Sequence, residues 1–225
     1  SPKKLEVIGH GSSNGVSLSR YSISALKEEK IEETKKRMNY DPSLKYFLSV
    51  GRIVHDKGMD ELLNAFVRLH ATNPHTRLVL VGAFEDEVDP VSDKARQLIQ
   101  THPAVIMAGW SDAVEYFMHL SFTLVHPSHR EGFPNVLLQA GAMGCPIICS
   151  RIDGNIDIVE HAATGLLFEV KSEEELFQQL QYALDNPAVL QHYAKTLRLH
   201  IEHHFDQPVL HSLLRKKYLE LLAAQ

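Results

Sequence analysis

The residues best suited to chemistry lie in two short segments, each following an apolar run. The first extends from Gly51 to Gly58 and contains two basic side chains, Arg52 and Lys57. Glycine allows the tight turn and close backbone approach that such a segment needs. Two fixed cations beside the start of a helix can bind an anion as large as a diphosphate without a metal ion.

The second segment follows the apolar run that ends at His126. It carries one carboxylate, Glu131, just before a proline, Pro134. Proline suits the first turn of a helix, because its φ is fixed and it needs no hydrogen-bond acceptor. We therefore expect the backbone amides of Asn135 and Val136 to point back at the strand ends. An anion on these amides would lie within reach of Glu131, which could accept hydrogen bonds from sugar hydroxyls.

The elements that must position these segments alternate along the chain. The expected strands are apolar throughout rather than alternating, which is typical of parallel strands covered on both faces. They are Leu5–Ile8, Tyr46–Val50, Arg77–Val81, Val105–Ala108, Phe122–His126, Pro146–Cys149 and Gly165–Phe168. Between them lie segments of helical period, so the sequence predicts a doubly wound, mainly parallel, Rossmann-like α/β sheet. Ligands bind such sheets beyond the carboxyl ends of the strands.

Several helix boundaries can be predicted. A helix over Met59–Ala71 has an apolar stripe and two acidic residues in its first turn. The capping-box pattern Ser172–Glu175 begins another helix, which should end before Asn186. Two last helices, over 188–204 and 209–223, close the chain without a further strand. We expect one domain over residues 1–225, with residues 1–25 as the segment that leads into it.

Composition excludes several classes of protein. The net charge of -5 provides no basic stripe for nucleic acid. No apolar run approaches the roughly 20 residues that span a bilayer, and no signal peptide begins the chain, so we expect a cytoplasmic protein. The start at Ser1, without methionine, suggests a piece of a longer protein.

Two groups of potential metal ligands have simpler interpretations. Cys145 and Cys149 should be buried thiols flanking a strand, since zinc would need two more ligands nearby. The histidines at 200, 203 and 204 should form a solvated helix face, because further ligands are not evident. The acidic run from Glu85 to Asp89 should be a solvated loop rather than a magnesium site.

Over nearly its whole length the chain resembles the C-terminal domain of glycosyltransferase family 4, whose members are retaining enzymes with the two-domain GT-B fold. No single motif decides this; the order of the motifs does. The matching residues are Asn14-Gly15-Val16, Val50-Gly51-Arg52, Lys57-Gly58, Val79–Gly82, Gly109–Asp112, Pro127-Ser128, Glu131–Val136, Ala140, Gly144–Pro146, Gly154, Asp157–Val159 and Thr164-Gly165.

The resemblance implies a role for each site residue. Arg52 and Lys57 would hold the donor diphosphate and stabilise its departure. Glu131 would bind hydroxyls of the transferred hexose, helped by the amides near Gly132 and Phe133. The amides of Asn135 and Val136 would cap the phosphates. The remaining donor-binding residues would be Asn14, Gly15 and Gly51, together with Gly109 and Trp110 beside the base and Gln139 at the ribose.

Two positions depart from the family pattern. Gln139 stands where the family has a second Glu, and Ser17 stands where it usually has Asp. An amide can still bind a ribose hydroxyl, but it loses a charge-assisted bond worth about 1 kcal/mol beyond a neutral one. Neither change removes the diphosphate site, but both bear on which donor is bound.

The resemblance predicts transfer of a hexose from a UDP- or GDP-sugar, with retention and without a required metal or cofactor. The acceptor would be a glycan or a polyprenyl-diphosphate-linked sugar in polysaccharide biosynthesis at the cytoplasmic face of the inner membrane. The acceptor site and any peripheral membrane contact would belong to a missing N-terminal domain. The isolated chain would then bind nucleotide weakly and catalyse nothing.

Other functions compete with this prediction. A two-carboxylate glycosidase site is not evident. The run Gly9–Gly15 resembles a dinucleotide fingerprint only superficially, since its last gap is one residue too long and the next strand ends without an acidic ribose ligand. A nucleotide-sugar epimerase of the same architecture and a non-catalytic nucleotide-sugar-binding module stay open as alternatives.

Overall fold

The computed structural model describes residues 7, 11–12, 14–85, 87 and 89–223. Its centre is a six-stranded parallel sheet in the order β3-β2-β1-β4-β5-β6. The strands are β1 (Lys45–Val50), β2 (Thr76–Val81), β3 (Val105–Met107), β4 (Thr123–His126), β5 (Ile147–Ser150) and β6 (Leu166–Phe168). The predicted doubly wound α/β fold is confirmed, and each predicted strand after residue 40 is present within two residues of its expected bounds. The strand expected at Leu5–Ile8 lies, except for Val7, outside the described residues.

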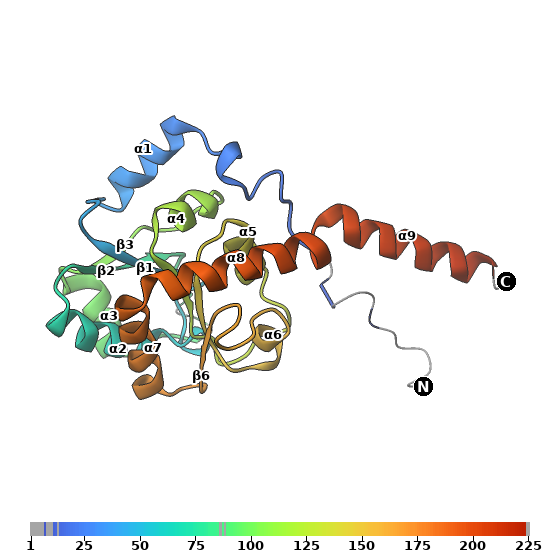
Figure 1. The fold of residues 1–225 in the computed structure, drawn as a ribbon. Coiled ribbons are helices and arrows are strands. Elements are labelled where there is room, and N and C mark those ends of the chain that lie inside the picture. Colours follow the sequence, from blue (N-terminus) through green and yellow to red (C-terminus); the bar gives the residue numbers. More distant parts are fainter. Residues whose placement is uncertain (1–6, 8–10, 13, 86, 88, 224–225) are drawn as a thin grey trace.

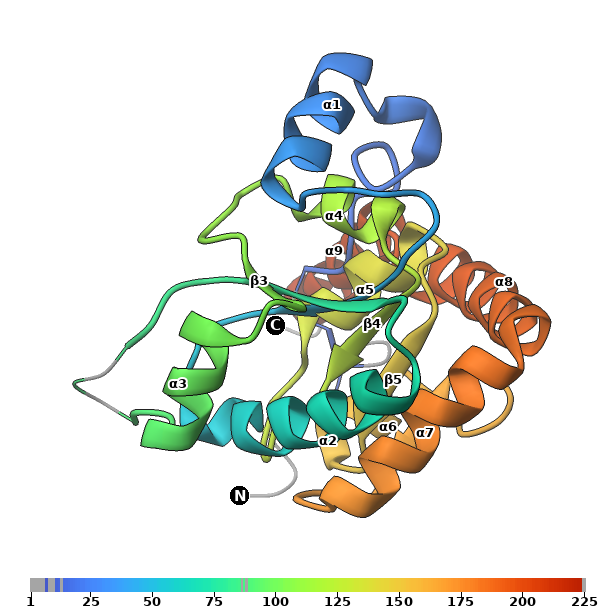
Figure 2. The ribbon, with the colours of Figure 1, turned by 90° about the vertical axis from the view of Figure 1, so that its left-hand side faces the viewer.

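Helices cover both faces of the sheet (Figures 1 and 2). The α-helices are α1 (Glu28–Arg37), α2 (Met59–Thr72), α3 (Asp93–Thr101), α4 (Val114–Leu120), α5 (Asn135–Ala142), α6 (Asp153–Ile156), α7 (Glu173–Asp185), α8 (Pro187–His204) and α9 (Gln207–Ala223). Two short 3-10 helices are η2 (Ile23–Ala25) and η3 (His55–Lys57). Among the described residues, no helix is long and apolar enough to cross a bilayer.

The sheet separates two apolar cores. Helices α2, α3 and α7 pack on one face, where Phe47 and Phe66 are fully buried. Helices α4, α5 and α8 pack on the other, around Phe117 and Phe205. Successive strand residues alternate between the two cores, because neighbouring side chains of a strand point to opposite faces. This explains why the strands are apolar at nearly every position.

The strand order reverses its direction of winding between β1 and β4. These two strands are neighbours in the sheet but not in the sequence. The loops that follow them therefore diverge to opposite faces and leave a crevice, the usual ligand site in such sheets. They are the two segments that the sequence identifies, at Gly51–Gly58 and Pro127–Pro134.

The leading segment and the end of the chain meet beside the sheet. The amide of Val16 donates to the carbonyl oxygen of Phe205 over 2.8 Å, and the amide of Gln207 donates to that of Val16 over 3.1 Å. Arg20 is 3.1 Å from Glu115, a buried carboxylate on α4. Beyond this junction α9 stands off from the body of the domain (Figure 1).

Two smaller expectations, a helix cap and a pair of buried thiols, can be compared with the structure. Ser172 caps α7 by accepting a hydrogen bond from the amide of Glu175, but the Glu175 carboxylate accepts from the amide of Glu169 and does not complete a capping box. Cys145 and Cys149 are buried free thiols, and burial raises the pKa of Cys145 to about 12. In the described part of the chain, no three His, Cys, Asp or Glu side chains gather as a metal site.

We expect Gly82→Ala to destabilise the fold, because a Cβ at this position would lie 1.8 Å from the carbonyl oxygen of Gly51. Overpacking of this kind costs about 1–3 kcal/mol in free energy of unfolding, measurable by urea denaturation. Gly132→Ala is the control, since a Cβ added at Gly132 would have no heavy atom within 4 Å. Equal stability of the two variants would contradict the prediction.

Candidate functional site

The centre of the site is an ion pair between the two loops at the crevice. The Lys57 ammonium lies 2.5 Å from Oε1 of Glu131, and both side chains are 17% exposed. Lys57 ends η3, after β1, and Glu131 follows β4. The predicted meeting of these residues is therefore observed, although it is a direct contact rather than two groups waiting on opposite sides of a ligand.

Two more side chains surround the same carboxylate oxygen. The hydroxyl of Ser128 donates to Oε1 of Glu131 over 2.8 Å. Nε2 of His126 lies 3.1 Å from that oxygen but is not aligned for a hydrogen bond. Burial alone would raise the pKa of Glu131, but His126, Lys57 and Ser128 outweigh it and lower the pKa from 4.5 to about 2. Glu131 is therefore an anion, and so an acceptor, at neutral pH.

Close backbone contacts hold the two loops together. Gly58 has φ +68°, and a Cβ there would lie 2.2 Å from the carbonyl oxygen of Pro127. The amide of His129 donates to the carbonyl oxygen of Asp56 over 2.8 Å. On the far side, Gly154 of α6 leaves room for the carbonyl oxygen of Gly132, only 2.7 Å from where its Cβ would be. The position of Glu131 is thus fixed by its backbone as well as by its ion pair.

Arg52 points to a different partner than the sequence suggests. Its guanidinium lies 2.7 Å from Oε2 of Glu85, in the acidic run after β2, and it is half exposed. Glu85 raises the pKa of Arg52, with smaller contributions from Asp56 and Glu131. The acidic run is therefore not simply a solvated loop, because its first residue neutralises a cation of the site.

Arg52 also borders a cavity of about 290 Å³ over the ends of β1 and β2. Gly51, Trp110 and Ser111 line this cavity, and the Trp110 side chain is 70% exposed. The residue before Trp110 is Gly109, which has a left-handed backbone with φ +73°. The structure therefore brings Gly51, Arg52 and the Gly109–Trp110 loop together, with an aromatic ring available for stacking.

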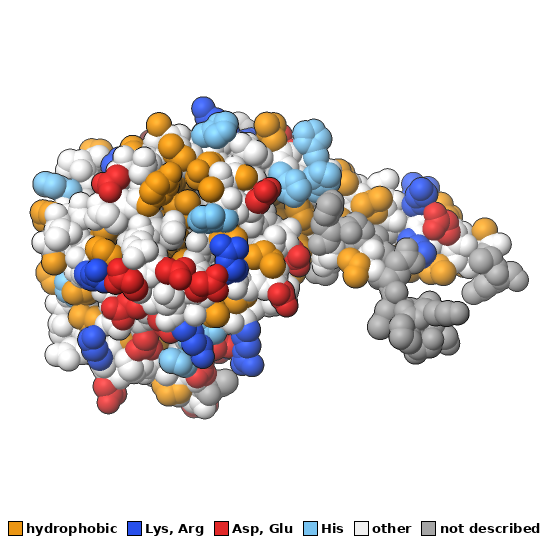
Figure 3. Space-filling view, turned by 60° about the horizontal axis from the view of Figure 1, so that its bottom comes forward, with side chains coloured by type: hydrophobic (Ala, Val, Ile, Leu, Met, Phe, Trp, Pro, Cys, Tyr) orange, Lys and Arg blue, Asp and Glu red, His pale blue; other side chains and the backbone are white. Residues whose placement is uncertain are grey.

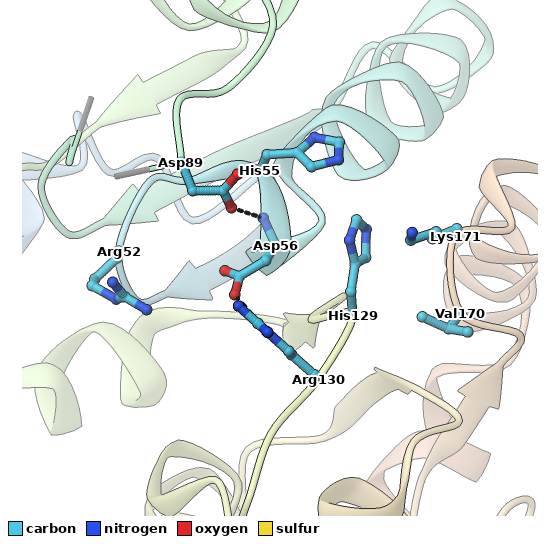
Figure 4. A pocket seen from close by; sticks show the side chains of 8 residues that line it. All are labelled: Arg52, His55, Asp56, Asp89, His129, Arg130, Val170 and Lys171. Atoms are coloured by element: carbon cyan, nitrogen blue, oxygen red, sulfur yellow. Dashed lines mark hydrogen bonds and ion pairs between the residues drawn. The ribbon is translucent and has the colours of Figure 1, made fainter. Parts of the chain in front are cut away.

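A second, larger cavity of about 700 Å³ lies on the other side of Arg52 (Figure 4). Its lining comes from the loops after β1, β2, β4 and β6: Arg52, His55, Asp56, Asp89, His129, Arg130, Val170 and Lys171. Arg130 pairs with Asp56 at 3.1 Å, while the amide of Asp56 donates to Asp89 over 2.7 Å. Lys57 and Glu131 do not line it, so the cavity adjoins the site without containing its central ion pair.

Helix α5 begins one residue later than expected. Pro134 has φ -80° and ψ 102° and precedes the helix, which starts at Asn135. The early amides of a helix have no intrahelical acceptor, so those of Asn135 and Val136, in the first turn of α5, are available to another acceptor. Phe133 packs against Phe205, with ring centroids 5.7 Å apart, which anchors the loop to the end of α8.

The other predicted site residues lie farther from the ion pair. Gln139 lies in the second turn of α5, close to the buried Tyr21 of the leading segment. Burial raises the pKa of Tyr21, and the Gln139 side chain offsets a small part of this shift. Gly15 packs on Phe205, and Oδ1 of Asn14 lies 3.4 Å from Nε2 of His211. Asn14 and Gly15 thus belong to the junction between the leading segment and α9. Phe205 lies between this junction and Phe133 of the site loop.

The positions of His126 and Glu85 beside the site residues were not predicted from the sequence, and Ser128 was given no role in the site. His126 is the last residue of an otherwise apolar strand, and this change of character at the strand end was the available signal. Glu85 could not be matched to Arg52, because the two are 33 residues apart and their pairing depends on adjacent strands. On the face drawn in Figure 3, acidic and basic side chains are interspersed and form no continuous basic stripe.

Acid should selectively reduce the contribution of Glu131 to stability. Because its folded-state pKa of about 2 lies below the ordinary 4.5, the ionised carboxylate stabilises the fold above pH 4.5, and this contribution is lost as the pH falls towards 2. We expect the difference in free energy of unfolding between wild type and Glu131→Gln to be about 2–3 kcal/mol near neutral pH and to shrink below pH 4.5.

Urea denaturation at a series of pH values measures this difference. Glu33→Gln is a matched control, because Glu33 also pairs with a lysine, Lys30 at 2.7 Å, but is 55% exposed. Solvent screening should make its effect much smaller. A difference for Glu131→Gln that is constant between pH 6 and pH 3 would contradict the assigned environment.

Comparison with known proteins agrees with this geometry. The sequence profile of the family "Glycosyl transferases group 1" matches residues 30–200. The capsular polysaccharide biosynthesis glycosyltransferase CapM of Staphylococcus aureus is 27% identical over 215 residues, covering 96% of this chain and 55% of CapM. The glycogen synthase of Mycobacterium tuberculosis is 30% identical over 174 residues, covering 76% of this chain and 42% of the synthase.

Solved structures show the same fold. HepE of Anabaena, in complex with UDP, matches with a TM-score of 0.78 at 19% identity, covering 94% of this chain and 56% of HepE. The chain thus has the α/β fold found in GT-B glycosyltransferases and spans about half the length of these relatives. Since the profile matches most of its residues, the chain belongs to the glycosyl transferases group 1 family.

Proposed function

We propose that the chain is the donor-binding domain of a retaining glycosyltransferase similar to family 4. It would transfer a hexose from a nucleoside-diphosphate sugar to a glycan or lipid-linked acceptor in polysaccharide biosynthesis. The observation that carries the proposal is the Lys57–Glu131 pair at the crevice between β1 and β4. Lys57 would supply a cation for phosphate, and Glu131 would supply a carboxylate for sugar hydroxyls, at the start of α5.

The chemistry follows from where charge develops. When the bond from sugar to diphosphate breaks, negative charge grows on the leaving phosphate. Lys57, Arg52 and the amides of Asn135 and Val136 would stabilise that charge, because fixed donors need little reorganisation during the reaction. Arg52 would exchange Glu85 for the diphosphate. The same cations would do the electrostatic work that a metal ion does in other transferases.

The base would occupy the cavity lined by Trp110 and Gly51, and the ribose would face Gln139. The nearby Tyr21 is compatible with an amide at this position, because a tyrosine hydroxyl and an amide can each donate and accept hydrogen bonds. A UDP-sugar or a GDP-sugar is the proposed donor. Complex formation with UDP by HepE supports the former.

A second domain would complete the enzyme. The chain spans 55% of CapM and 56% of HepE, and α9 exposes an apolar surface away from the body of the domain. The exposed apolar side chains of α9 lie on several sides of the helix and are Leu213, Tyr218, Leu219, Leu221 and Leu222, each at least 39% exposed. An N-terminal domain packed there would supply the acceptor site at the cytoplasmic face of the membrane. The domain over residues 1–225 alone would then bind donor without transferring it.

The first test is nucleotide binding. Trp110 is the only tryptophan of the chain, so stacking of a base on its ring should change its fluorescence directly. We expect UDP or GDP to do so without added metal and more strongly than NAD, with affinities confirmed by calorimetry. ADP completes the series and reports selectivity for the base. A preference for NAD would overturn both the transferase and the epimerase interpretation.

Substitutions assign the binding to the site. Arg52→Ala and Lys57→Ala should each weaken nucleoside diphosphate binding by about tenfold or more, the usual effect of losing a charge-assisted hydrogen bond. Arg68→Ala is the matched control. Arg68 also pairs with a carboxylate, Glu174, and is 49% exposed against 47% for Arg52, but it lies on α2 away from the crevice. Equal losses in all three variants would refute the assignment.

The second test is transfer itself. With the complete enzyme, we expect a labelled hexose to move from its nucleotide to a lipid-linked or glycan acceptor with retained configuration, whereas the 225-residue chain alone shows no turnover. Chromatography of the product and NMR of its anomeric proton measure both. Interconversion of the nucleotide-sugar without acceptor would indicate an epimerase, and binding without either reaction would indicate a non-catalytic module.

A further inference from the structure

His126 has an unusual environment for a buried histidine. It ends β4, is 5% exposed, and its Nε2 has no hydrogen-bond partner in the structure. A buried polar atom without a partner is destabilising, because it has lost its hydrogen bonds to water and has gained none in the protein. The atom nearest to being its partner is Oε1 of Glu131, at 3.1 Å. His126 is therefore placed for a hydrogen bond that it does not make in this state.

The oxygen that His126 approaches is already in use. Lys57 lies 2.5 Å from it and the Ser128 hydroxyl donates to it over 2.8 Å. A carboxylate oxygen accepts two well-aligned hydrogen bonds with its two lone pairs. The third donor is held out of line for as long as Lys57 and Ser128 occupy both positions.

Donor binding would change this competition. In the function proposed above, on which this inference rests, the ammonium of Lys57 turns towards the diphosphate. Oε1 of Glu131 then loses its closest partner, and a carboxylate free to rotate would no longer present its other oxygen in one direction. The next donor within reach is Nε2 of His126, provided that it carries a proton.

We propose that His126 is a positioning residue, which becomes the hydrogen-bond donor to Oε1 of Glu131 when Lys57 engages the donor phosphates. The carboxylate then keeps its orientation, with Oε2 directed to a hydroxyl of the transferred sugar. His126 itself contacts neither the phosphates nor the sugar. Its effect is therefore confined to ligands that carry the sugar.

The experiment compares two ligands that differ only in the sugar. Calorimetry gives the ratio of the Kd values for UDP and UDP-glucose, or for GDP and GDP-mannose if the chain prefers guanine. We expect wild type to bind the sugar form more tightly, and His126→Leu to reduce that advantage about tenfold, as for a lost hydrogen bond to a charged group, while the Kd for the nucleoside diphosphate stays unchanged. His126→Gln should restore most of the ratio, because its side-chain N–H donors reach close to the position of Nε2.

The control is Thr123→Val at the other end of β4. Thr123 is fully buried and its hydroxyl donates to the carbonyl oxygen of Pro146 over 2.9 Å, so its loss destabilises the same strand without touching Glu131. The Kd ratio should not change in this variant. Thermal unfolding of each variant shows whether it is folded at the temperature of the titration.

Each contrary outcome is distinct. A ratio unchanged in His126→Leu, or equally reduced in His126→Leu and His126→Gln, overturns the positioning role while the proposed function stands. A wild-type chain that binds both ligands equally also overturns it, since Glu131 then makes no contact with the sugar. A wild-type chain that binds no nucleotide at all overturns the proposed function, and the role of His126 with it.

Discussion

The arrangement of the site depends on one ion pair, between Lys57 and Glu131, made across the boundary between two loops. Removing two opposite charges from water costs free energy that their attraction only partly returns. Replacing the whole pair, which is 17% exposed on each side, by apolar side chains would therefore change stability little, whereas removing one partner leaves the other charge unpaired. The main effect of the pair is to hold the two loops in a fixed relative position. The left-handed turn at Gly58 and its contact with Pro127 bring the loops close enough for the pair to form. Helix α5 begins four residues after Glu131, so the pair also helps to place its first turn.

The other cations of the crevice are also paired with carboxylates. Arg52 pairs with Glu85, Arg130 with Asp56, and Lys57 with Glu131. These three cations thus each have a carboxylate partner of their own. Under the proposed function, a diphosphate would have to exchange with these carboxylates. The binding strength would then be a difference between two sets of ion pairs, which would make it sensitive to the exact anion.

Much of the fold could be predicted from the sequence, because parallel strands covered on both faces are apolar at every position and glycine or proline marks their ends. Lys57 and Glu131 were predictable as well, since each follows a strand in a recognisable motif. The partners of these residues were not. Glu85 lies beside Arg52 and His126 beside Glu131, because adjacent strands bring them together, and Tyr21 of the leading segment is close enough to Gln139 to be affected by it. Such contacts arise from tertiary packing, and neither periodicity nor spacing encodes them. The start of α5 was misplaced by one residue because proline suits both sides of a helix boundary.

The junction of Val16 with Phe205 and Gln207 has a mechanical consequence. Two hydrogen bonds hold Val16 against the turn between α8 and α9, so this part of the leading segment and the start of α9 lie side by side. A second domain joined through the leading segment and seated on α9 would be held at two neighbouring points instead of one. Two adjacent attachments permit rotation about the line that joins them and resist twisting about other axes. Under the proposed function, rotation about that line would move a second domain towards or away from the crevice that holds Glu131.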